Sequence, residues 1–239
     1  MKKLVLAAVA ALLSVGLFAQ SFSLNEDGTP VVDTDSWSMW NSDGTFGWGY
    51  HMMIDGDAEF LGNTPAFGKN REFFFSLIGG EFRPVKFLGL SGTIDLNWDS
   101  YRLNKTNYWV PDHNGGVSVA SLEGSNYTKI KKSILRSFGF DIPVQLKIHL
   151  GDVCIGGGIV GEFNFNGRTK FKAIDASGEK VKNGDMKATD IKSLPFTYSY
   201  RASITYAHMG IYGKYSPCSQ FQQGFGPQFS YWTIGLILW

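Results

Sequence analysis

Six charged residues occupy alternate positions in strand-like segments, and together they could do chemistry. Carboxylates beside cationic groups can act as general acids and bases or can line a path for ions. The same groups can instead form a salt-bridge network that plugs a narrow barrel. We predict the second arrangement, a compensated polar network inside a lumen, because the interior of a small barrel must be filled. Its members are Asp95, Asp99, Asp141, Lys147, Glu162 and Arg201.

The four histidines form no recognisable catalytic or metal-binding pattern. His51, His149 and His208 lie on or beside the predicted strands, and His113 lies in a loop. The chain has no His-x-x-x-His pair and no cysteine close to a histidine, as a zinc site would need. It also lacks a His-x-Ser element and a G-x-S-x-G elbow. We therefore predict no enzyme, no metal and no cofactor, and keep an outer-membrane lipid-modifying enzyme as the remote alternative.

The glycine triplet at 156–158 invites comparison with a phosphate-binding loop. It precedes a further strand segment rather than a helix, and no Lys-Ser or Lys-Thr pair follows it. Glycine in the wall of a barrel relieves crowding and permits sharp coiling. We interpret the triplet as a structural feature of a strand.

The elements that would position these residues are strands with a two-residue period. In 137–167 the apolar residues occupy even positions before the HLGD turn and odd positions after it, with polar residues on the opposite faces. Such alternation is typical of strands that separate an apolar from a polar environment. Eight strands are predicted, near 45–54, 71–82, 86–101, 133–148, 152–166, 195–207, 209–216 and 228–239.

The connections between these strands alternate between long and short. The short ones centre on Arg83–Val85, Leu150–Gly151 and Ala207–His208, and the long ones are 55–70, 102–132, 167–194 and 217–227. A transmembrane barrel has short turns on one side and long loops on the other, whereas a soluble sandwich has no such requirement. The sequence therefore predicts an all-β fold, a closed antiparallel up-and-down transmembrane β-barrel of eight strands. Segments 31–40 and 117–122 leave a ten-stranded barrel open as the alternative.

The beginning of the chain indicates export. Residues 1–19 combine two lysines with a short apolar run and a small residue before Gln20, the pattern of a cleaved signal peptide. Residues 20–43 are acidic and are predicted to form a periplasmic N-terminal segment, and 44–239 the barrel. We expect the outer membrane of a Gram-negative bacterium. The net charge of +1 gives no reason to expect nucleic-acid binding.

A soluble lipocalin-like barrel is the alternative for the fold, because it would reverse the two faces. The apolar face carries too many aromatic side chains for one small interior, among them Trp48, Trp98, Phe138, Phe140 and Tyr198. In a membrane the same side chains face acyl chains, and the backbone groups pair around a closed ring.

The last strand ends on an aromatic residue with a two-residue period behind it. Tyr231, Gly235, Ile237 and Trp239 are the positions counted back from the end. This pattern is similar to the C-terminal signal that the barrel-assembly machinery of outer membranes reads. The opposite face of the strand is at least as apolar.

The stretch FDIPVQLKI, a tight turn, and then GGGIVGEFNFNGR resembles the PorT-like outer-membrane β-barrel family. The resemblance covers roughly 86–166 and is weaker over 195–239. It implies a β-barrel fold and a location in the outer membrane. Since members include a component of a secretion and gliding apparatus but mostly have no assigned role, it implies little about activity.

The outer loops are rich in basic residues, above all 167–194 with Arg168, Lys170, Lys172, Lys180 and Lys182. Such a rim could contact the anionic sugars and phosphates of lipopolysaccharide. Ordinary solvated loops are the alternative interpretation.

We predict that the chain is a structural or interaction scaffold whose outer loops or acidic tail meet a partner that the sequence does not identify. A narrow channel for small or hydrophobic solutes is the second hypothesis, and an enzyme is the third.

Overall fold

The computed structural model describes residues 40–54, 70–103, 105–112, 114–182 and 189–238 of the chain. Its elements are all strands over this part, as the two-residue periodicity predicts. They are β1 (Trp40–Ser42), β2 (Phe46–Ile54), β3 (Arg71–Val85), β4 (Leu88–Arg102), β5 (Asn107–Pro111), β6 (Val117–Ser121), β7 (Tyr127–Leu150), β8 (Val153–Asp175), β9 (Lys180–Lys182), β10 (Phe196–Tyr206), β11 (Met209–Ser216) and β12 (Ser230–Leu238).

Eight of these strands form a closed hydrogen-bonded ring. The order is β2, β3, β4, β7, β8, β10, β11 and β12, and every pairing is antiparallel. The ring closes between β12 and β2, where Thr233 lies opposite His51 and Leu238 opposite Phe46. The structure therefore confirms an eight-stranded up-and-down barrel.

The ten-stranded alternative is wrong. Strand β1 lies along β3 beyond the end of β2, so that the two pieces form one strand broken at residues 43–45. At the break the Asp43 N–H donates to the Gly79 carbonyl oxygen over 3.2 Å. The second candidate, 117–122, pairs with β5 in a separate two-stranded sheet. Residues 31–39 lie outside the described part of the chain.

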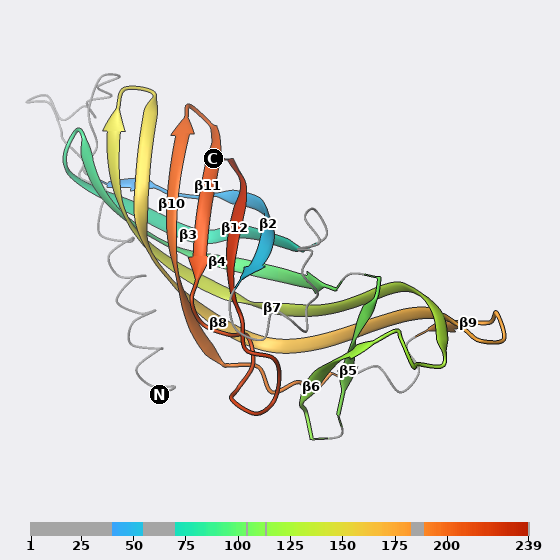
Figure 1. The fold of residues 1–239 in the computed structure, drawn as a ribbon. Helices are drawn as coiled ribbons and strands as arrows, with labels where there is room; N and C mark the ends of the chain where they lie inside the picture. Colours follow the sequence, from blue (N-terminus) through green and yellow to red (C-terminus); the bar gives the residue numbers. More distant parts are fainter. Residues whose placement is uncertain (1–39, 55–69, 104, 113, 183–188, 239) are drawn as a thin grey trace, which may run out of the picture.

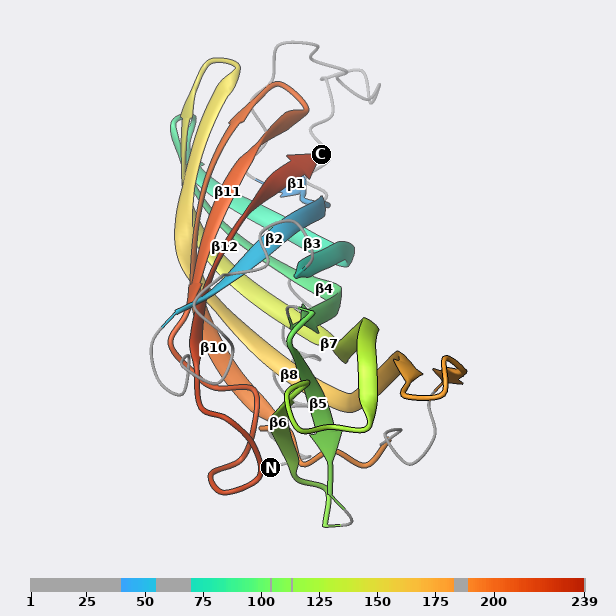
Figure 2. The ribbon, with the colours of Figure 1, turned by 45° about the vertical axis from the view of Figure 1, so that its right-hand side comes forward.

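Short turns gather at one end of the barrel and long segments at the other (Figures 1 and 2). The short turns are 86–87, 151–152 and 207–208. The first of these was predicted three residues too early, at Arg83–Val85. Strand β3 instead runs to Val85 through a register shift after Phe82. A proline without an N–H group is tolerated at such an irregularity, so Pro84 does not end the strand.

Strands β7 and β8 are far longer than predicted, with 24 and 23 residues. They continue beyond the barrel as one hairpin, and β9 pairs with the far end of β8 (Figure 1). A turn at 176–178 joins β8 to β9. The β5–β6 hairpin packs against the inner face of this extension, where Tyr108 joins Ile130 and Phe171 in a buried cluster.

Pro143 interrupts the pairing of β7 locally without forming a bulge. The pairing of β7 with β4 passes from Gly92–Val144 to Asp95–Asp141 and keeps its register, while residues 142 and 143 are unpaired on that side. On the other side Pro143 lies opposite Val160 in regular register with β8. The missing N–H group therefore interrupts one ladder only.

Candidate functional site in the barrel lumen

Polar side chains line the inside of the ring because they occupy one face of every strand. In β10, for example, Thr197, Ser199, Arg201, Ser203 and Thr205 are buried while the residues between them are exposed. All six residues of the predicted polar network are buried on this inner face. The structure brings five of them together at mid-height and places Lys147 apart, near the short turns.

Lys214 occupies the centre of the lumen and contacts two carboxylates. Its Nζ atom lies 3.1 Å from Oε1 of Glu162 and forms a second ion pair with Glu72. The Thr197 and Ser199 hydroxyls donate to the two oxygens of Glu162 over 2.8 and 2.7 Å. A fully buried ammonium group is tolerated where its charge is compensated in this way.

Arg201 and Asp95 form the second buried ion pair, with 3.6 Å between Nη1 and Oδ2. The guanidinium carbon lies 4.3 Å from the ring centre of Phe74, in cation–π geometry. Ser76 and Thr93 donate their hydroxyl protons to Oδ1 of Asp95 over 2.7 and 2.6 Å. The Asp95 carboxylate is therefore held by two hydroxyl groups and a nearby cation.

The remaining carboxylates are linked through an amide and an imidazole. The Asn97 side-chain amide donates to Asp141 over 3.0 Å and to Asp99 over 3.3 Å. The His51 Nε2 atom lies 3.0 Å from Asp99, and its Nδ1 atom lies 2.8 Å from the Thr233 hydroxyl oxygen. Acid, imidazole and hydroxyl thus stand in the order that nucleophilic catalysis uses.

This arrangement is sealed from solvent. His51 and Thr233 have no exposed surface. The imidazole stacks on Tyr101 with 5.2 Å between ring centres and meets Tyr231 edge-on at 4.9 Å. A catalytic hydroxyl must reach its substrate, so the geometry favours a structural hydrogen-bond chain over an active site.

Lys147 belongs to a second ionic group at the short-turn end. Its Nζ atom lies 2.6 Å from Asp43 and 3.7 Å from Glu81. Glu81 also pairs with Arg83 at 2.7 Å and with His149 at 2.5 Å. Asp43 reaches the lumen because the first strand is broken beside it, between β1 and β2.

Sequence reasoning missed Glu72, Lys214, His51, Asp43 and Glu81 as members of these groups. The parity of the strands could have found three of them, including His51, which alternates with Tyr50 and Met52 in β2. Lys214 shares a face with Tyr212 and Ser216, and Glu72 precedes the inward-facing Phe74 by two residues. Asp43 could not be found this way, since its position depends on the break in the first strand.

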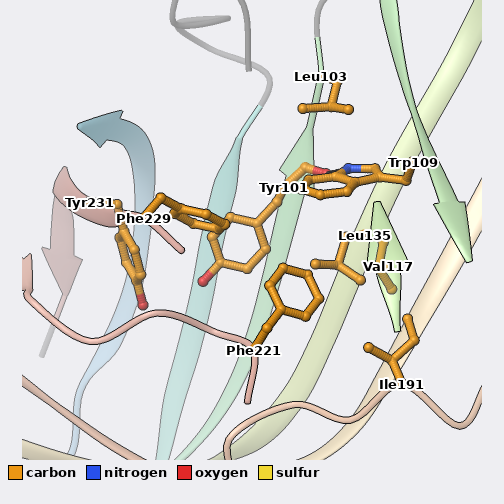
Figure 3. Packing of buried hydrophobic residues seen from close by; sticks show 9 residues of the cluster. All are labelled: Tyr101, Leu103, Trp109, Val117, Leu135, Ile191, Phe221, Phe229 and Tyr231. Carbon is orange, nitrogen blue, oxygen red and sulfur yellow. Dashed lines mark hydrogen bonds between the residues drawn. The ribbon is translucent and has the colours of Figure 1, made fainter. Parts of the chain in front are cut away.

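An aromatic and aliphatic cluster covers the lumen at the long-loop end (Figure 3). Trp109 from β5 is the largest member, and it donates its indole N–H to the Tyr101 carbonyl oxygen over 3.1 Å. The loops that carry Ile191 and Phe221 close over the inward-facing ends of β4 and β12. We call this cluster the aromatic cap; it comprises Tyr101, Leu103, Trp109, Val117, Leu135, Ile191, Phe221, Phe229 and Tyr231.

The residues of the predicted assembly signal lie on the inner face of β12. Tyr231 and Ile237 are buried, Gly235 is half-buried, and Trp239 lies outside the described residues. The outward face of the same strand carries Trp232, Ile234, Leu236 and Leu238, all exposed. The outward side of the strand is therefore the more apolar one, and the signal stays a prediction.

The predicted basic loop residues do not form a loop. Arg168, Lys170 and Lys172 lie on β8, and Lys180 and Lys182 lie on β9, which pairs with it. All five occupy the outward face of the extended hairpin, on the side away from the β5–β6 hairpin.

The described residues contain neither a candidate metal site nor a helix that could span a membrane. No group of three or more His, Cys, Asp or Glu residues there could hold a metal ion. No helix in the same part of the chain is long and apolar enough to cross a membrane.

Comparisons with known proteins give no family. No protein-family model matches the chain, and no curated protein matches it. The resemblance to PorT-like barrels therefore stays a prediction.

Solved structures of other proteins match the chain at low similarity. The attachment invasion locus protein Ail of Yersinia pestis matches with a TM-score of 0.37 and 12% identity, over 82% of this chain and 96% of that one. The toluene transporter TodX of P. putida matches with a TM-score of 0.31 and 13% identity, over 85% of this chain and 57% of that one. Similarities of this size assign no function.

Proposed function

We propose that the chain is an integral outer-membrane β-barrel that acts as a scaffold, with a lumen filled by its own side chains. The proposal rests chiefly on one observation: a closed ring of strands carries apolar side chains outward and ion pairs inward. Hydrocarbon cannot satisfy backbone polar groups, so a spanning sheet must close and must expose apolar side chains. A soluble barrel of this size would have the opposite polarity.

The outward surface has the dimensions of a bilayer core. Along β7 the outward residues from Phe138 to Ile148 are all apolar, and at a strand tilt of about 40° they cover about 25 Å. Around the ring, the exposed residues include Leu77, Leu90, Leu146, Ile159, Ile204, Ile211, Ile234 and Leu236. A continuous surface of this kind would be unstable in water.

An aromatic girdle marks one boundary of this surface. Outward aromatic side chains on six consecutive barrel strands, from β2 through β3, β4, β7 and β8 to β10, have neighbouring ring centres 4.7 to 6.4 Å apart. Aromatic side chains prefer the interface between acyl chains and headgroups. The girdle comprises Phe46, Phe73, Trp98, Phe138, Phe140, Phe163, Phe165 and Phe196.

The interior supports a scaffold better than a pore. Lys214 is fully buried between two carboxylates, and the aromatic cap lies over the lumen at the long-loop end. An eight-stranded barrel is just wide enough for side chains to fill. Interaction surfaces are then the outer hairpins rather than a conduit.

Planar-bilayer recording of the refolded mature chain tests this function against a narrow channel. We expect no step currents from the wild-type protein. Step currents that disappear on Arg201→Met would favour the channel and overturn the filled-lumen scaffold. The same preparation tests the membrane assignment, because a chain that folds in plain buffer without detergent or lipid would contradict it.

An outer-membrane enzyme is the third candidate, favoured only by the Asp99–His51–Thr233 arrangement. Incubation of the refolded protein with lipid A tests it, with released fatty acid as the readout. We expect no release. Release that is abolished by Thr233→Val, or by changing His149 or His208, would establish the enzyme instead.

We further propose that the scaffold belongs to the PorT-like family and that it binds a protein partner. The resemblance is supported by a tight turn that joins β7 to the glycine-rich β8, and it assigns no role. Identification of proteins that co-purify with the chain from its native membrane tests this part, and a chain recovered alone would count against a scaffold.

A further inference from the structure

The hairpin of β7 and β8 carries two different faces beyond the aromatic girdle. On the inner face, Ile130, Phe171 and Ala173 are buried against the β5–β6 hairpin. The outer face has no protein layer over it in the described structure and continues the outward surface of the barrel. Strand alternation places the basic residues of this region on that outer face.

The register brings these residues together in rows across neighbouring strands. Arg71, Ser100, Arg136 and Arg168 form the first row beyond the girdle. The next rows are Arg102, Ile134 and Lys170; then Lys132, Lys172 and Lys182; and then Lys129, Ile174 and Lys180. We call this set the basic face, and it extends over β3, β4, β7, β8 and β9.

Among the described residues, the ion pairs of Asp and Glu side chains involve no residue of the basic face. The segments 100–102, 129–136, 168–174 and 180–182 contain no Asp or Glu. Like charges directly opposite one another on neighbouring strands destabilise a sheet, yet Lys132 faces Lys172, and Lys172 faces Lys182. An external anion that neutralises these rows would remove the repulsion.

The environment of Lys132 reflects this crowding. Partial burial lowers the pKa of its ammonium group, and the neighbouring charges of Arg136 and Lys170 lower the pKa further. Ile134, between Arg102 and Lys170 in the register, is only 6% exposed although it lies on the outward face. Long basic side chains cover apolar surface with their methylene groups and direct their charges away from it.

The position of the basic face distinguishes a lipid surface from a soluble anion. Arg136 lies two residues beyond Phe138 of the girdle on the same face of β7, about 7 Å along the strand. If the girdle marks the end of the acyl region, the phosphates of the outer leaflet lie at the height of the first rows. The face also lies on the side of the hairpin opposite the buried contacts with the β5–β6 hairpin.

We propose that the basic face binds the phosphate groups of lipopolysaccharide in the outer leaflet and so fixes the height and orientation of the β7–β8 hairpin. The proposal rests on the outer-membrane function proposed above. It adds Arg71, Arg102 and Arg136, and it places Lys129 and Lys132 of the predicted 102–132 loop beside the five basic residues of 167–194.

Native mass spectrometry of the detergent-refolded mature chain tests the proposal. The probes are bisphosphorylated lipid A and the same lipid A without its phosphates. We expect the phosphorylated lipid to bind more tightly, and the K170Q/K172Q/K182Q variant to lose about 10- to 100-fold of that affinity, since each charge near a lipid surface contributes separately. The K170R/K172R/K182R variant keeps the charges and should bind as the wild type does.

A second triple variant controls for overall charge. K86Q/K105Q/K192Q removes three exposed lysines that lie off the basic face, and we expect wild-type binding from it. Equal binding of both lipid A forms, or unchanged binding by K170Q/K172Q/K182Q, would overturn the proposal. Displacement of bound lipid A by a soluble sulfated polysaccharide at equal phosphate and sulfate concentration would overturn the choice of a lipid surface.

The two proposals fail in different ways. A chain that folds without detergent or lipid removes the membrane function itself. A chain that folds only in detergent, shows heat-modifiable migration in a gel and yet has no preference for phosphorylated lipid A contradicts only the basic-face proposal.

Discussion

Lys214 shows at the scale of a single residue how the lumen depends on compensated charge. The ammonium group is buried with Glu72 and Glu162, and each carboxylate would be left without its cation if the lysine were removed. Breaking a buried ion pair from one side is costly, whereas removing both sides together is often tolerated.

We expect Lys214→Met to lower the free energy of unfolding by about 3–5 kcal/mol. The double variant K214M/E72Q should recover part of this loss because it removes one of the stranded charges. Urea unfolding in lipid vesicles, followed by gel mobility, measures both. Lys86→Met, at an exposed turn, is the matched control. A stable K214M single variant would contradict the compensated-lumen interpretation.

His51 makes a second prediction at this scale, since its imidazole bridges Asp99 and Thr233. We expect His51→Ala to cost about 1–3 kcal/mol, because it leaves buried polar groups without a partner. His208 is exposed in a turn, so His208→Ala should change the stability little. Equal stability of the two variants would mean that the hydrogen-bond chain is not structural.

At the scale of a single strand, the glycines of the 156–158 triplet have different roles because neighbouring residues face opposite sides of β8. A Cβ atom on Gly158 would collide with the carbonyl oxygen of Val144 on the neighbouring strand, whereas one on Gly157 meets nothing within 4 Å. Close approach of the two backbones therefore requires glycine at position 158 and not at position 157.

We expect Gly158→Val to prevent folding or to shift the refolding yield far below that of the wild type, because the β7–β8 pairing cannot form undistorted. Gly157→Val places a β-branched side chain on the open outward face and should fold normally. Heat-modifiable gel migration after refolding measures both. Equal yields would contradict the close approach.

The β5–β6 hairpin is an element whose position depends on Trp109. The indole is buried in the aromatic cap, and the Trp109 backbone N–H donates to the Ser133 hydroxyl oxygen over 2.8 Å. Truncation of a buried tryptophan removes about 3–5 kcal/mol of packing.

We expect Trp109→Ala to leave the barrel folded while the hairpin becomes sensitive to protease. Cleavage by trypsin at Lys105, followed by mass spectrometry, should be faster than in the wild type. Ser118→Ala, at an exposed position of the same hairpin, should leave the rate unchanged. An unfolded barrel in W109A would instead show that the cap is part of the barrel core.

At the scale of the whole molecule, the membrane assignment depends on which face of the wall meets lipid. Gln145 and Leu146 are neighbours on β7, yet their exposed fractions are 8% and 52%. A fluorophore at Leu146→Cys should be quenched by a lipid-dissolved nitroxide, and one at Gln145→Cys should not. The reverse result would contradict the orientation of every strand, since neighbouring residues alternate between faces.

The sequence predicted the number of barrel strands and the polarity of their faces because both depend on a two-residue period that is local. It could not predict how far β7 and β8 extend beyond the barrel. The parts of these strands outside the barrel lie against the β5–β6 hairpin and not between two environments of opposite polarity. The first turn was predicted too early because Pro84 suggested the end of a strand, whereas an irregularity in β3 accommodates this proline.

The sequence predicted that charged residues fill the lumen, but it did not predict which of them form ion pairs. Asp95 and Arg201 were identified from alternation, but the closeness of Lys214 to Glu72 joins residues 142 positions apart in the chain. Only the closure of the ring brings such strands together around one narrow lumen.

By itself, the alternation of side chains along Phe138 to Ile148 determined which face of the wall is apolar, because that pattern is fixed by the geometry of one strand. The tertiary structure decided which charges meet, that an imidazole is sealed beneath Tyr101 and Tyr231, and that scattered lysines form one basic face. These outcomes depend on the register between strands, which a single strand does not contain.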